Sequence, residues 1–339
     1  MRIPYTGPLP APRIIPRDAT TLTNAVTALA NFLTASPSRT VVLSGAGISV
    51  ASGLADYRGP KGTYTQNKTY RPIYYHEFLA NHEARKRYWA RSFLGWTNLH
   101  RARPNPAHLA IKRLGELGIV RSVVTQNVDS FHTIAHPALS TLELHGFLRS
   151  LVCVTCGTHL SRETFQNSLA ALNPAWAAFL ASALASGALD TENPDERRAK
   201  GMKTNPDGDV DLPDAPYSTF RYPACPTCLA HPPPSTLASS STSPAPPHRV
   251  VVDADGAWTS ASTAGILKPA VVMFGESIPT AVKQAAEHAI DAADRLLVIG
   301  SSLATYSAWR LVRRAQDQGI PIGILNLGGV RGEDEFFKD

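Results

Sequence analysis

Two cysteine pairs constrain the fold of this chain more than any other feature of its sequence. The chain has four cysteines, spaced as Cys153-Val-Thr-Cys156 and Cys225-Pro-Thr-Cys228. Two thiolate pairs at this spacing can close a tetrahedral zinc site, whereas Cys-x-x-Cys is a poor geometry for a structural disulfide. Four thiolates leave no open coordination position, so we expect one structural Zn²⁺. The long stretch between the pairs, residues 157–224, predicts a zinc module inserted into a larger domain.

Length and charge restrict the class of protein. A chain of 339 residues can bury a sizeable core as one large domain or two smaller ones, and no apolar run reaches membrane-spanning length. The net charge of +6 suits acidic partners, and the densest basic stretch runs from Arg85 to Arg103. Aromatic residues interleave with it at near-helical spacing, so we interpret the basic side chains as a solvated helix face and expect no direct nucleic-acid binding.

Hydrophobic patterning predicts an alternating α/β chain. Leu22, Val26, Leu29 and Leu33 mark one face of a helix, and a buried-strand run follows at 40–44. Further β-rich runs lie at 119–125, 270–274, 296–300 and 322–325, with helical patterns at 107–117 and 281–290 between them. This alternation predicts a Rossmann-like, doubly wound parallel sheet.

We expect five segments along the chain. These are an N-terminal extension at 1–20, a discontinuous Rossmann-like domain at 21–150 and 266–330, a small zinc-binding module at 151–265 and a C-terminal tail at 331–339. Within the module, residues 231–247 are a low-complexity run of proline and serine that cannot bury a core, and we expect it to be disordered.

A glycine turn follows the strand predicted at 40–44. Gly45 and Gly47 can let a backbone approach a pyrophosphate whose charge lies near helix N–H groups. No strand-end acid follows at the ~20-residue distance that a ribose-binding carboxylate usually has, and such turns also occur as tight strand-to-helix connections. From this turn alone, a nucleotide site and a simple connection both remain open.

Polar side chains follow several of the predicted strands. Asn127 and Asp129 come after one strand, His145 lies just before the first cysteine pair, and Ser301 and Asn326 follow the last two strands. The carboxyl ends of parallel strands line one crevice, so these groups should converge there. Taken singly, each also fits an ordinary role, as a helix cap, a hydrogen-bonded core histidine or a turn residue.

Together these motifs make the chain resemble the sirtuins, the NAD-dependent protein-lysine deacylases. The likeness runs in order from about residue 40 to 329 and is closest to the class II branch typified by mitochondrial sirtuin four. The family motifs are Gly45–Ser49, Asp56–Arg58, Thr125–Asp129, Leu144–Gly146, the cysteine pairs, Val272–Glu276 and Gly300–Ser302. The class II motifs are Arg71–Ile73, Arg87–Arg91, Gly95–Trp96, Pro104–His108, Leu172–Trp176 and Pro206–Val210.

The resemblance implies that NAD⁺ is a co-substrate. It implies a pyrophosphate at Gly45–Gly47, nicotinamide beside Ile48 and Asp129, and adenosine near Gly300. The full set of implied NAD⁺ contacts is Gly45, Ala46, Gly47, Ile48, Ser49, Asp56, Tyr57, Arg58, Gln126, Asn127, Asp129, Gly300, Ser301, Ser302, Asn326 and Leu327.

The resemblance also implies the chemistry. The carbonyl oxygen of an acylated protein lysine attacks the ribose carbon as nicotinamide departs, giving an alkylimidate that ends as O-acyl-ADP-ribose. We expect His145 to be the general base for a ribose hydroxyl, because a neutral imidazole can take a proton at cellular pH. Asn127 and Gln126 would orient ribose and a water, since amides do not titrate.

The family captures its peptide by strand addition, with the acyl-lysine in an apolar tunnel. Here the implied substrate contacts are Val272, Phe274, Gly275 and Glu276, together with the stretch after Ser302 near Thr305 and Tyr306. Ordinary sheet core is the alternative role for these residues.

Three departures from the family pattern are visible. Phe131-His-Thr-Ile-Ala-His136-Pro137 replaces a more usual run, and Met273 replaces a frequent phenylalanine, which could admit a different acyl group. The chain stops at Asp339, where relatives continue with a segment that helps enclose the adenine, and this predicts weaker adenine binding or a truncated gene model.

Other functions stay open at this point. A mono-ADP-ribosyltransferase on the same scaffold is the main alternative, followed by a redox Rossmann enzyme and a non-catalytic zinc-stapled binding module. The resemblance to sirtuin four predicts a mitochondrial location, with cytoplasm or nucleus as alternatives. Residues 1–17 carry three arginines and no acid.

Overall fold

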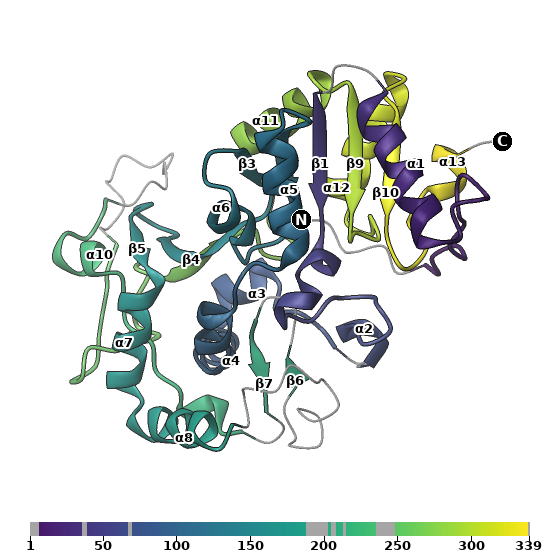
Figure 1. The fold of residues 1–339 in the computed structure, drawn as a ribbon. Helices are drawn as coiled ribbons and strands as arrows, with labels where there is room; N and C mark the ends of the chain where they lie inside the picture. Colours follow the sequence, from purple (N-terminus) through teal and green to yellow (C-terminus); the bar gives the residue numbers. More distant parts are fainter. Residues whose placement is uncertain are drawn as a thin grey trace.

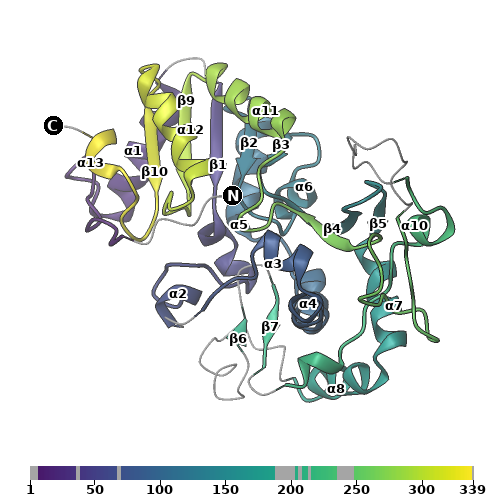
Figure 2. The same cartoon turned by 180° about the vertical axis from the view of Figure 1, so that it is seen from behind.

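A five-stranded parallel sheet forms the larger part of the fold. The computed structural model describes residues 7–35, 39–66, 70–187, 203–204, 208–212, 215–234 and 248–337. The strand order is β10-β9-β1-β2-β3, and every neighbouring pair is parallel (Figures 1 and 2). The strands are β1 (Thr40–Ser44), β2 (Val120–Thr125), β3 (Ser140–Glu143), β9 (Arg295–Ile299) and β10 (Ile322–Leu325). The predicted Rossmann-like sheet is therefore confirmed.

Helices cover both faces of this sheet. On one face lie α1 (Leu22–Thr34) and α5 (Pro106–Glu116), whose Leu33 and Ile111 share a core with Val42 of β1 (Figure 1). On the other lie α11 (Thr280–Asp291) and α12 (Tyr306–Asp317), whose core includes Val41 and Leu43 (Figure 2). Successive side chains of a strand point to opposite faces, so all five residues of β1 are buried. This explains why β1 reads as a continuous run rather than an alternating one.

Helix α1 is only partly packed. Of its predicted apolar face, Leu33 is buried, whereas Leu22 is 83 % exposed and Val26 57 % exposed. The helix is confirmed, but only its C-terminal turns contribute to the core.

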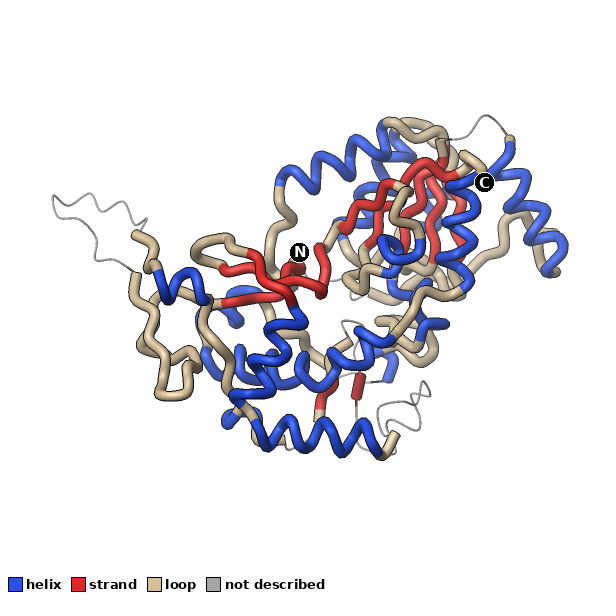
Figure 3. The backbone as a smooth tube through the Cα atoms, turned by 60° about the vertical axis from the view of Figure 1, so that its left-hand side comes forward, coloured by secondary structure: helices blue, strands red, loops and turns tan. Residues whose placement is uncertain are grey.

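A second sheet corrects one predicted strand. The run at 270–274 does not join the parallel sheet: β8 (Leu267–Val271) pairs antiparallel with β4 (Gly146–Cys153), which also pairs with β5 (His159–Ser161). The two sheets are separate in space (Figure 3). A turn ends β8, because Glu276 N donates to Met273 O and Gly275 adopts φ +82°. The fifth strand of the parallel sheet is instead β3, a short, largely polar strand at the edge opposite β10 that hydrophobic patterning did not indicate.

The remaining elements pack mostly around the second sheet. They include η1 (Ala46–Ser52), α2 (Thr63–Gln66), α3 (Tyr75–Ala80), α4 (His82–Arg101), α6 (Phe131–Ala135), α7 (Arg162–Leu172), α8 (Pro174–Ala185), β6 (Lys203–Thr204), β7 (Val210–Asp211), η2 (Tyr217–Thr219), α10 (Pro226–Ala230) and α13 (Glu333–Phe336). Trp89 and Phe93 of α4 share one buried cluster with Leu169 of α7, Phe220 and Cys225. Helix α4 therefore packs with the cysteine-bearing region rather than with the parallel sheet.

The interpretation of the 85–103 stretch as a solvated face is wrong for two residues. Arg85 is 2 % exposed and Arg91 is 6 % exposed, while Trp89 and Phe93 are buried as expected. Arg85 Nε donates to Tyr222 Oη at 2.7 Å, and its Nη1 donates to the Phe78 carbonyl oxygen at 2.7 Å. Buried guanidinium groups with such partners stabilise a helix interface rather than solubilise a surface.

The two ends of the described chain meet. Arg13 N donates to Glu333 Oε1 at 3.1 Å, and the segment predicted as a tail contains α13, whose Glu333 is buried. Residues 235–247 of the proline- and serine-rich run lie outside the described residues, so its predicted disorder is not tested. Over the described residues no single helix is long and apolar enough to cross a membrane; α7 and α8 would meet that test only together, and they are bent by 113°.

Candidate functional site

The strand order creates a switch point at the centre of the parallel sheet. From β1 the chain continues to β2 and β3 on one side, whereas β9 and β10 lie on the other. Ligands bind such sheets outside the carboxyl ends of the strands that border the switch point, here β1 and β9. The turns after these strands are bonded together, because Gly47 N donates to Gly300 O at 2.9 Å and Gly45 N donates to Ile299 O at 3.0 Å.

This contact explains the two glycines of the turn after β1. A Cβ on Gly45 would lie 2.8 Å from Gly300 O, and a Cβ on Gly47 would lie 2.9 Å from Gly300 Cα. Both distances are too short for a side chain, so the glycines are required by the neighbouring turn. Sequence reasoning had considered the approach of a pyrophosphate and a tight strand-to-helix connection, but not this contact with the turn after β9.

A large cavity opens at this edge of the sheet. Its volume is about 1640 Å³, well above the roughly 300–1,000 Å³ of ordinary ligand pockets. It is lined by every residue that the sequence implied for NAD⁺, and also by His145, Val272 and Phe274. Gly275 and Glu276 are not among its lining residues. The cavity therefore has room for a dinucleotide and part of a second substrate.

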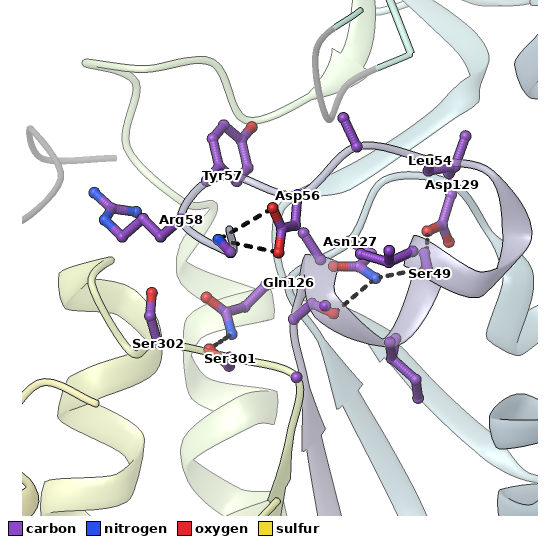
Figure 4. Close-up of a pocket in the computed structure, with 18 of the residues that line it drawn as sticks. Ser49, Leu54, Asp56, Tyr57, Arg58, Gln126, Asn127, Asp129, Ser301 and Ser302 are labelled. Carbon is purple, nitrogen blue, oxygen red and sulfur yellow. Dashed lines mark hydrogen bonds between the residues drawn. The ribbon is translucent and has the colours of Figure 1, made fainter. Parts of the chain in front are cut away.

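Asn127, Ser49 and Asp129 form a buried network beside the glycine turn (Figure 4). Asn127 Nδ2 donates to Gly45 O at 3.2 Å and to Ser49 Oγ at 3.1 Å, and Ser49 Oγ donates to Asp129 Oδ2 at 2.7 Å. Asn127 is therefore not a helix cap, whereas Asp129 Oδ1 does accept from Phe131 N at the start of α6. Burial raises the pKa of the Asp129 carboxyl, opposed by its hydrogen bonds.

Gln126 connects the two halves of the switch point. Its Nε2 donates to Ser301 Oγ at 2.7 Å (Figure 4), and its Oε1 accepts from Thr305 Oγ1 at 2.8 Å. The Gln126 side chain thus holds the end of β2 to the segment between β9 and α12. Its two partners lie 175 and 179 positions further along the chain.

His145 lines the cavity from the turn between β3 and β4. Its Nδ1 lies 3.0 Å from the Gln126 carbonyl oxygen, and its Nε2 lies 2.8 Å from Ser307 Oγ. Burial lowers the pKa of the imidazole to about 4, although the hydrogen bond to the Gln126 carbonyl oxygen acts to raise this pKa. The ring is therefore neutral at pH 7 and available as a proton acceptor.

The segment after η1 forms another wall. The Asp56 carboxylate accepts twice from Gly59 N at 3.1 Å, and burial raises the pKa of Asp56 (Figure 4). The guanidinium of Arg58 lies 5.0 Å from the centre of the Tyr64 ring, and burial lowers the Arg58 pKa. At the far rim, Asn326 Nδ2 donates to Gly328 O at 2.7 Å, and Leu327 is largely exposed.

Sequence reasoning missed a charged pair in this cavity. Arg91 of α4 and Asp209 both line it, with Nη2 and Oδ2 2.7 Å apart. Burial alone would lower the pKa of Arg91, but Asp209 and Asp211 outweigh it and raise this pKa above its ordinary value. Gly95 lets the 208–211 segment cross α4, since a Cβ there would lie 1.8 Å from Gly208 O. The aromatic side chains interleaved with Arg91 could have indicated that part of this helix is buried.

The four cysteines gather at one point of the second core. Cys153 and Cys228 Sγ lie 3.6 Å apart, Cys156 and Cys225 Sγ lie 3.7 Å apart, and all four sulfurs are within 4.8 Å of one another. A tetrahedral ion with Zn–S bonds of about 2.3 Å places its sulfurs roughly 3.8 Å apart. The cluster therefore fits one structural zinc ion. The four sulfurs would occupy all four of its coordination positions.

Comparison with known protein families identifies the family to which a chain with this site belongs. A model of the Sir2 family matches residues 45–307, which span the glycine turn, His145 and the cysteine cluster. The chain belongs to the Sir2 family. Sirtuins use NAD⁺, which agrees with the size and position of the cavity.

Relatives of this sirtuin cover nearly the whole chain. It is 39 % identical to the "NAD-dependent protein deacylase SIR4" of Batrachochytrium dendrobatidis, over 93 % of this chain and 89 % of the relative. It is 36 % identical to the "NAD-dependent protein deacylase SRT2" of Arabidopsis thaliana, over 88 % and 68 %. It is 34 % identical to the "NAD-dependent protein lipoamidase sirtuin-4, mitochondrial" of Bos taurus, over 90 % and 79 %. These matches place it with the class II, sirtuin-four-like branch.

Solved structures support the fold. A structure described as "Sir2-p53 peptide-NAD+" matches with a TM-score of 0.55 and 24 % identity, covering 91 % of this chain and 89 % of that one. Another, described as "Structural Basis for the Mechanism and Regulation of Sir2 Enzymes", matches with a TM-score of 0.58 and 24 % identity, over 94 % and 91 %. The architecture is that of the Sir2 fold.

Proposed function

We propose that this sirtuin is an NAD⁺-dependent protein-lysine deacylase that releases nicotinamide and O-acyl-ADP-ribose. The observation that carries the proposal is the convergence of His145 and the Gly45–Gly47 turn on one cavity that exceeds the volume of ordinary ligand pockets. Two of the relatives described above are named deacylases and one is named a lipoamidase, which supports the same reaction class over mono-ADP-ribosyl transfer.

Different residues of the cavity would bind different parts of NAD⁺. The backbone of Gly45–Gly47 would face the pyrophosphate at the switch point, and Arg58 would pair with its charge. Ser301 and Asn326 would bind the adenosine half, and Asp129 would bind the carboxamide of nicotinamide. When bound, NAD⁺ supplies a glycosidic bond that breaks to release nicotinamide.

His145 would act as the general base toward a ribose hydroxyl. Its Nδ1–H is held by the Gln126 carbonyl oxygen, which leaves Nε2 as the proton acceptor. A base of this kind typically contributes about 10²- to 10⁴-fold in rate. Asn127 and Gln126 are fixed by their own hydrogen bonds and would orient the ribose without moving protons.

The residues implied for the substrate fall into two groups, one inside the cavity and one outside it. Val272 and Phe274 line the cavity and would contact the acyl-lysine. Gly275 and Glu276 lie outside it and would contact the peptide backbone. Glu276 also forms an ion pair with Lys268 at 3.2 Å, so its side chain has a structural partner.

The proposal is tested with purified protein, NAD⁺ and a panel of peptides carrying acetyl-, glutaryl-, lipoyl- or long-chain acyl-lysine, with mass-spectrometric detection of products. We expect nicotinamide release to require an acylated peptide and O-acyl-ADP-ribose to accumulate. His145→Ala should lose acyl transfer by about 10²-fold or more. Protein labelling without an acyl peptide would favour the ADP-ribosyltransferase, and reduced nicotinamide would favour a redox enzyme.

Two further proposals concern organisation and location. We propose the two structural units expected from the sequence, a discontinuous Rossmann-like domain at 21–150 and 266–330 and a zinc-binding module at 151–265. Helices α3 and α4, although they lie within 21–150, share a buried core with the module. We also propose a mitochondrial location, supported by the name of the bovine relative. Fractionation of cells expressing the full chain with a C-terminal tag tests this location.

A further inference from the structure

His145 is held at both ring nitrogens, and the two partners differ in kind. The Gln126 carbonyl oxygen can only accept, so Nδ1 carries the proton of the neutral ring. Nε2 is then bare, and the Ser307 hydroxyl 2.8 Å away must donate to it. The base proposed above therefore rests in a chain that runs from Ser307 Oγ–H through the imidazole to a backbone carbonyl.

The position of Ser307 makes it a supporting residue. It is 7 % exposed in the first turn of α12 and is not among the residues that line the cavity, whereas His145 is. It cannot meet the ribose directly in this arrangement. Whatever Ser307 contributes must pass through the imidazole.

A second contact anchors Ser307 to the same element that anchors Nδ1. Thr305 precedes α12, and its Oγ1 donates to Gln126 Oε1 at 2.8 Å. Gln126 thus holds the ring through its carbonyl oxygen and holds the start of α12 through its side chain. These bonds close a loop from Gln126 to His145, to Ser307 and back through Thr305, and the loop determines where Nε2 points.

We propose that Ser307 is a positioning residue for the acyl-transfer half of the reaction. Its hydroxyl holds the resting imidazole with Nε2 unprotonated. When the ribose hydroxyl arrives, the Ser307 hydrogen turns away, the ribose O–H bond breaks and an Nε2–H bond forms. The ribose oxygen keeps the electron pair with which it attacks the acyl carbon, and Ser307 Oγ, now an acceptor, faces the new Nε2–H.

This inference rests on the proposed deacylase function and separates the two halves of the reaction. Nicotinamide leaves before the ribose hydroxyl is deprotonated, so exchange of labelled nicotinamide into NAD⁺ in the presence of acyl peptide does not need the base. Formation of O-acyl-ADP-ribose does. The rate of O-acyl-ADP-ribose formation divided by the rate of nicotinamide exchange therefore measures how well His145 is positioned to act as the base.

The test compares Ser307→Ala and Ser307→Thr with the unchanged protein. Losing one neutral hydrogen bond predicts a fall of about 2- to 13-fold in the ratio of product formation to nicotinamide exchange for S307A. S307T, which keeps the hydroxyl, should recover most of the ratio. In ¹⁵N spectra, the His145 Nε2 resonance of the resting protein should move in S307A and return in S307T.

The chain offers a matched control. Ser44 Oγ lies 2.8 Å from His132 Nε2, in a buried serine–histidine pair of the same length, and neither residue lines the cavity. S44A loses this bond and the one that Ser44 Oγ donates to Thr125 Oγ1 at 2.9 Å, so it should lower the melting temperature at least as much as S307A while leaving the ratio unchanged. An unchanged ratio and resonance in S307A, or an equal fall in S44A, would overturn the role of Ser307. Failure of the unchanged protein to release nicotinamide with any acyl peptide would instead overturn the proposed function.

Discussion

The backbone of Gly300, in the turn after β9, lies so close to the backbone of Ile48, after β1, that a side chain on Gly300 has no room. A Cβ on Gly300 would lie 2.4 Å from the Ile48 nitrogen, and Gly300 adopts φ +60°. The contact joins the turn after β9 to the turn after β1. The shape of the cavity floor therefore depends on a residue without a side chain.

Gly300→Ala should destabilise the protein and weaken NAD⁺ binding. The left-handed backbone alone costs an alanine about 1 kcal/mol, and overpacking adds roughly 1–3 kcal/mol. Gly319→Ala is the control, because Gly319 has φ +69° with no atom within 4 Å of a Cβ. Chemical denaturation and calorimetric NAD⁺ titration measure both effects. Equal losses in the two variants would show that the close contact contributes nothing.

Acid should destabilise the protein below about pH 6.5. Burial lowers the pKa of His108 to about 4 and that of His132 to about 2, and His145 also stays near 4. The unfolded chain binds protons near pH 6.5, so between that pH and the folded pKa it holds more protons than the folded chain, and stability falls as pH falls. Each histidine contributes up to about 1.4 kcal/mol per pH unit in its window.

The histidine prediction is checked by urea denaturation at several pH values from 7.5 to 5. His108→Gln removes one such group, so its free energy of unfolding should fall less steeply with acid than that of the unchanged protein, whatever its value at pH 7.5. Parallel curves would contradict the assignment of His108 as a histidine that is neutral when folded.

Removal of zinc should unfold the region around the cysteine cluster. Cys153, Cys225 and Cys228 belong to the buried core that also contains Trp89 and Leu169. Structural zinc contributes on the order of 10 kcal/mol to the folding of small zinc domains. Cys228→Ser should therefore lower metal content from one zinc per chain toward zero, as measured by mass spectrometry, and sharply lower the melting temperature.

Thr158→Val is a control for the cysteine variant. Thr158 Oγ1 lies 3.2 Å from Cys156 Sγ, but threonine is not a zinc ligand in such sites. One zinc per chain should remain. A Cys228→Ser protein with full zinc content would show that the fourth thiolate is not needed.

Asp209→Asn should destabilise the protein through Arg91. Both side chains are largely buried, at 7 % and 14 % exposure, and removing the Asp209 charge leaves the buried Arg91 with the more distant Asp211, whose Oδ1 lies 3.9 Å from Arg91 Nε. The expected loss is about 3 kcal/mol, at the lower end of the range for breaking a buried ion pair. Asp317→Asn, which alters an exposed pair with Arg313 on α12, should leave the melting temperature almost unchanged. Similar melting temperatures for the two variants would contradict a buried role for the pair.

Local sequence was sufficient to predict the parts of the fold that depend on short-range pattern. The strand at 40–44, the helices near 107–117 and 281–290, and the convergence of the four cysteines follow from periodicity and cysteine spacing, and the structure has all of them. Likewise, the polar residues implied for NAD⁺ do lie around one cavity, because the carboxyl ends of parallel strands must share an edge.

Tertiary packing decided the rest. The run at 270–274 has the pattern of a core strand, but only its antiparallel pairing with β4 moves it to another sheet, and no local pattern encodes that choice. Arg85 and Arg91 read as surface residues because a charge is costly to bury without a partner, and their partners Tyr222 and Asp209 lie more than one hundred residues away. For the same reason, the bond from Ser307 to His145 could be recognised only after folding had brought the start of α12 beside the turn that precedes β4.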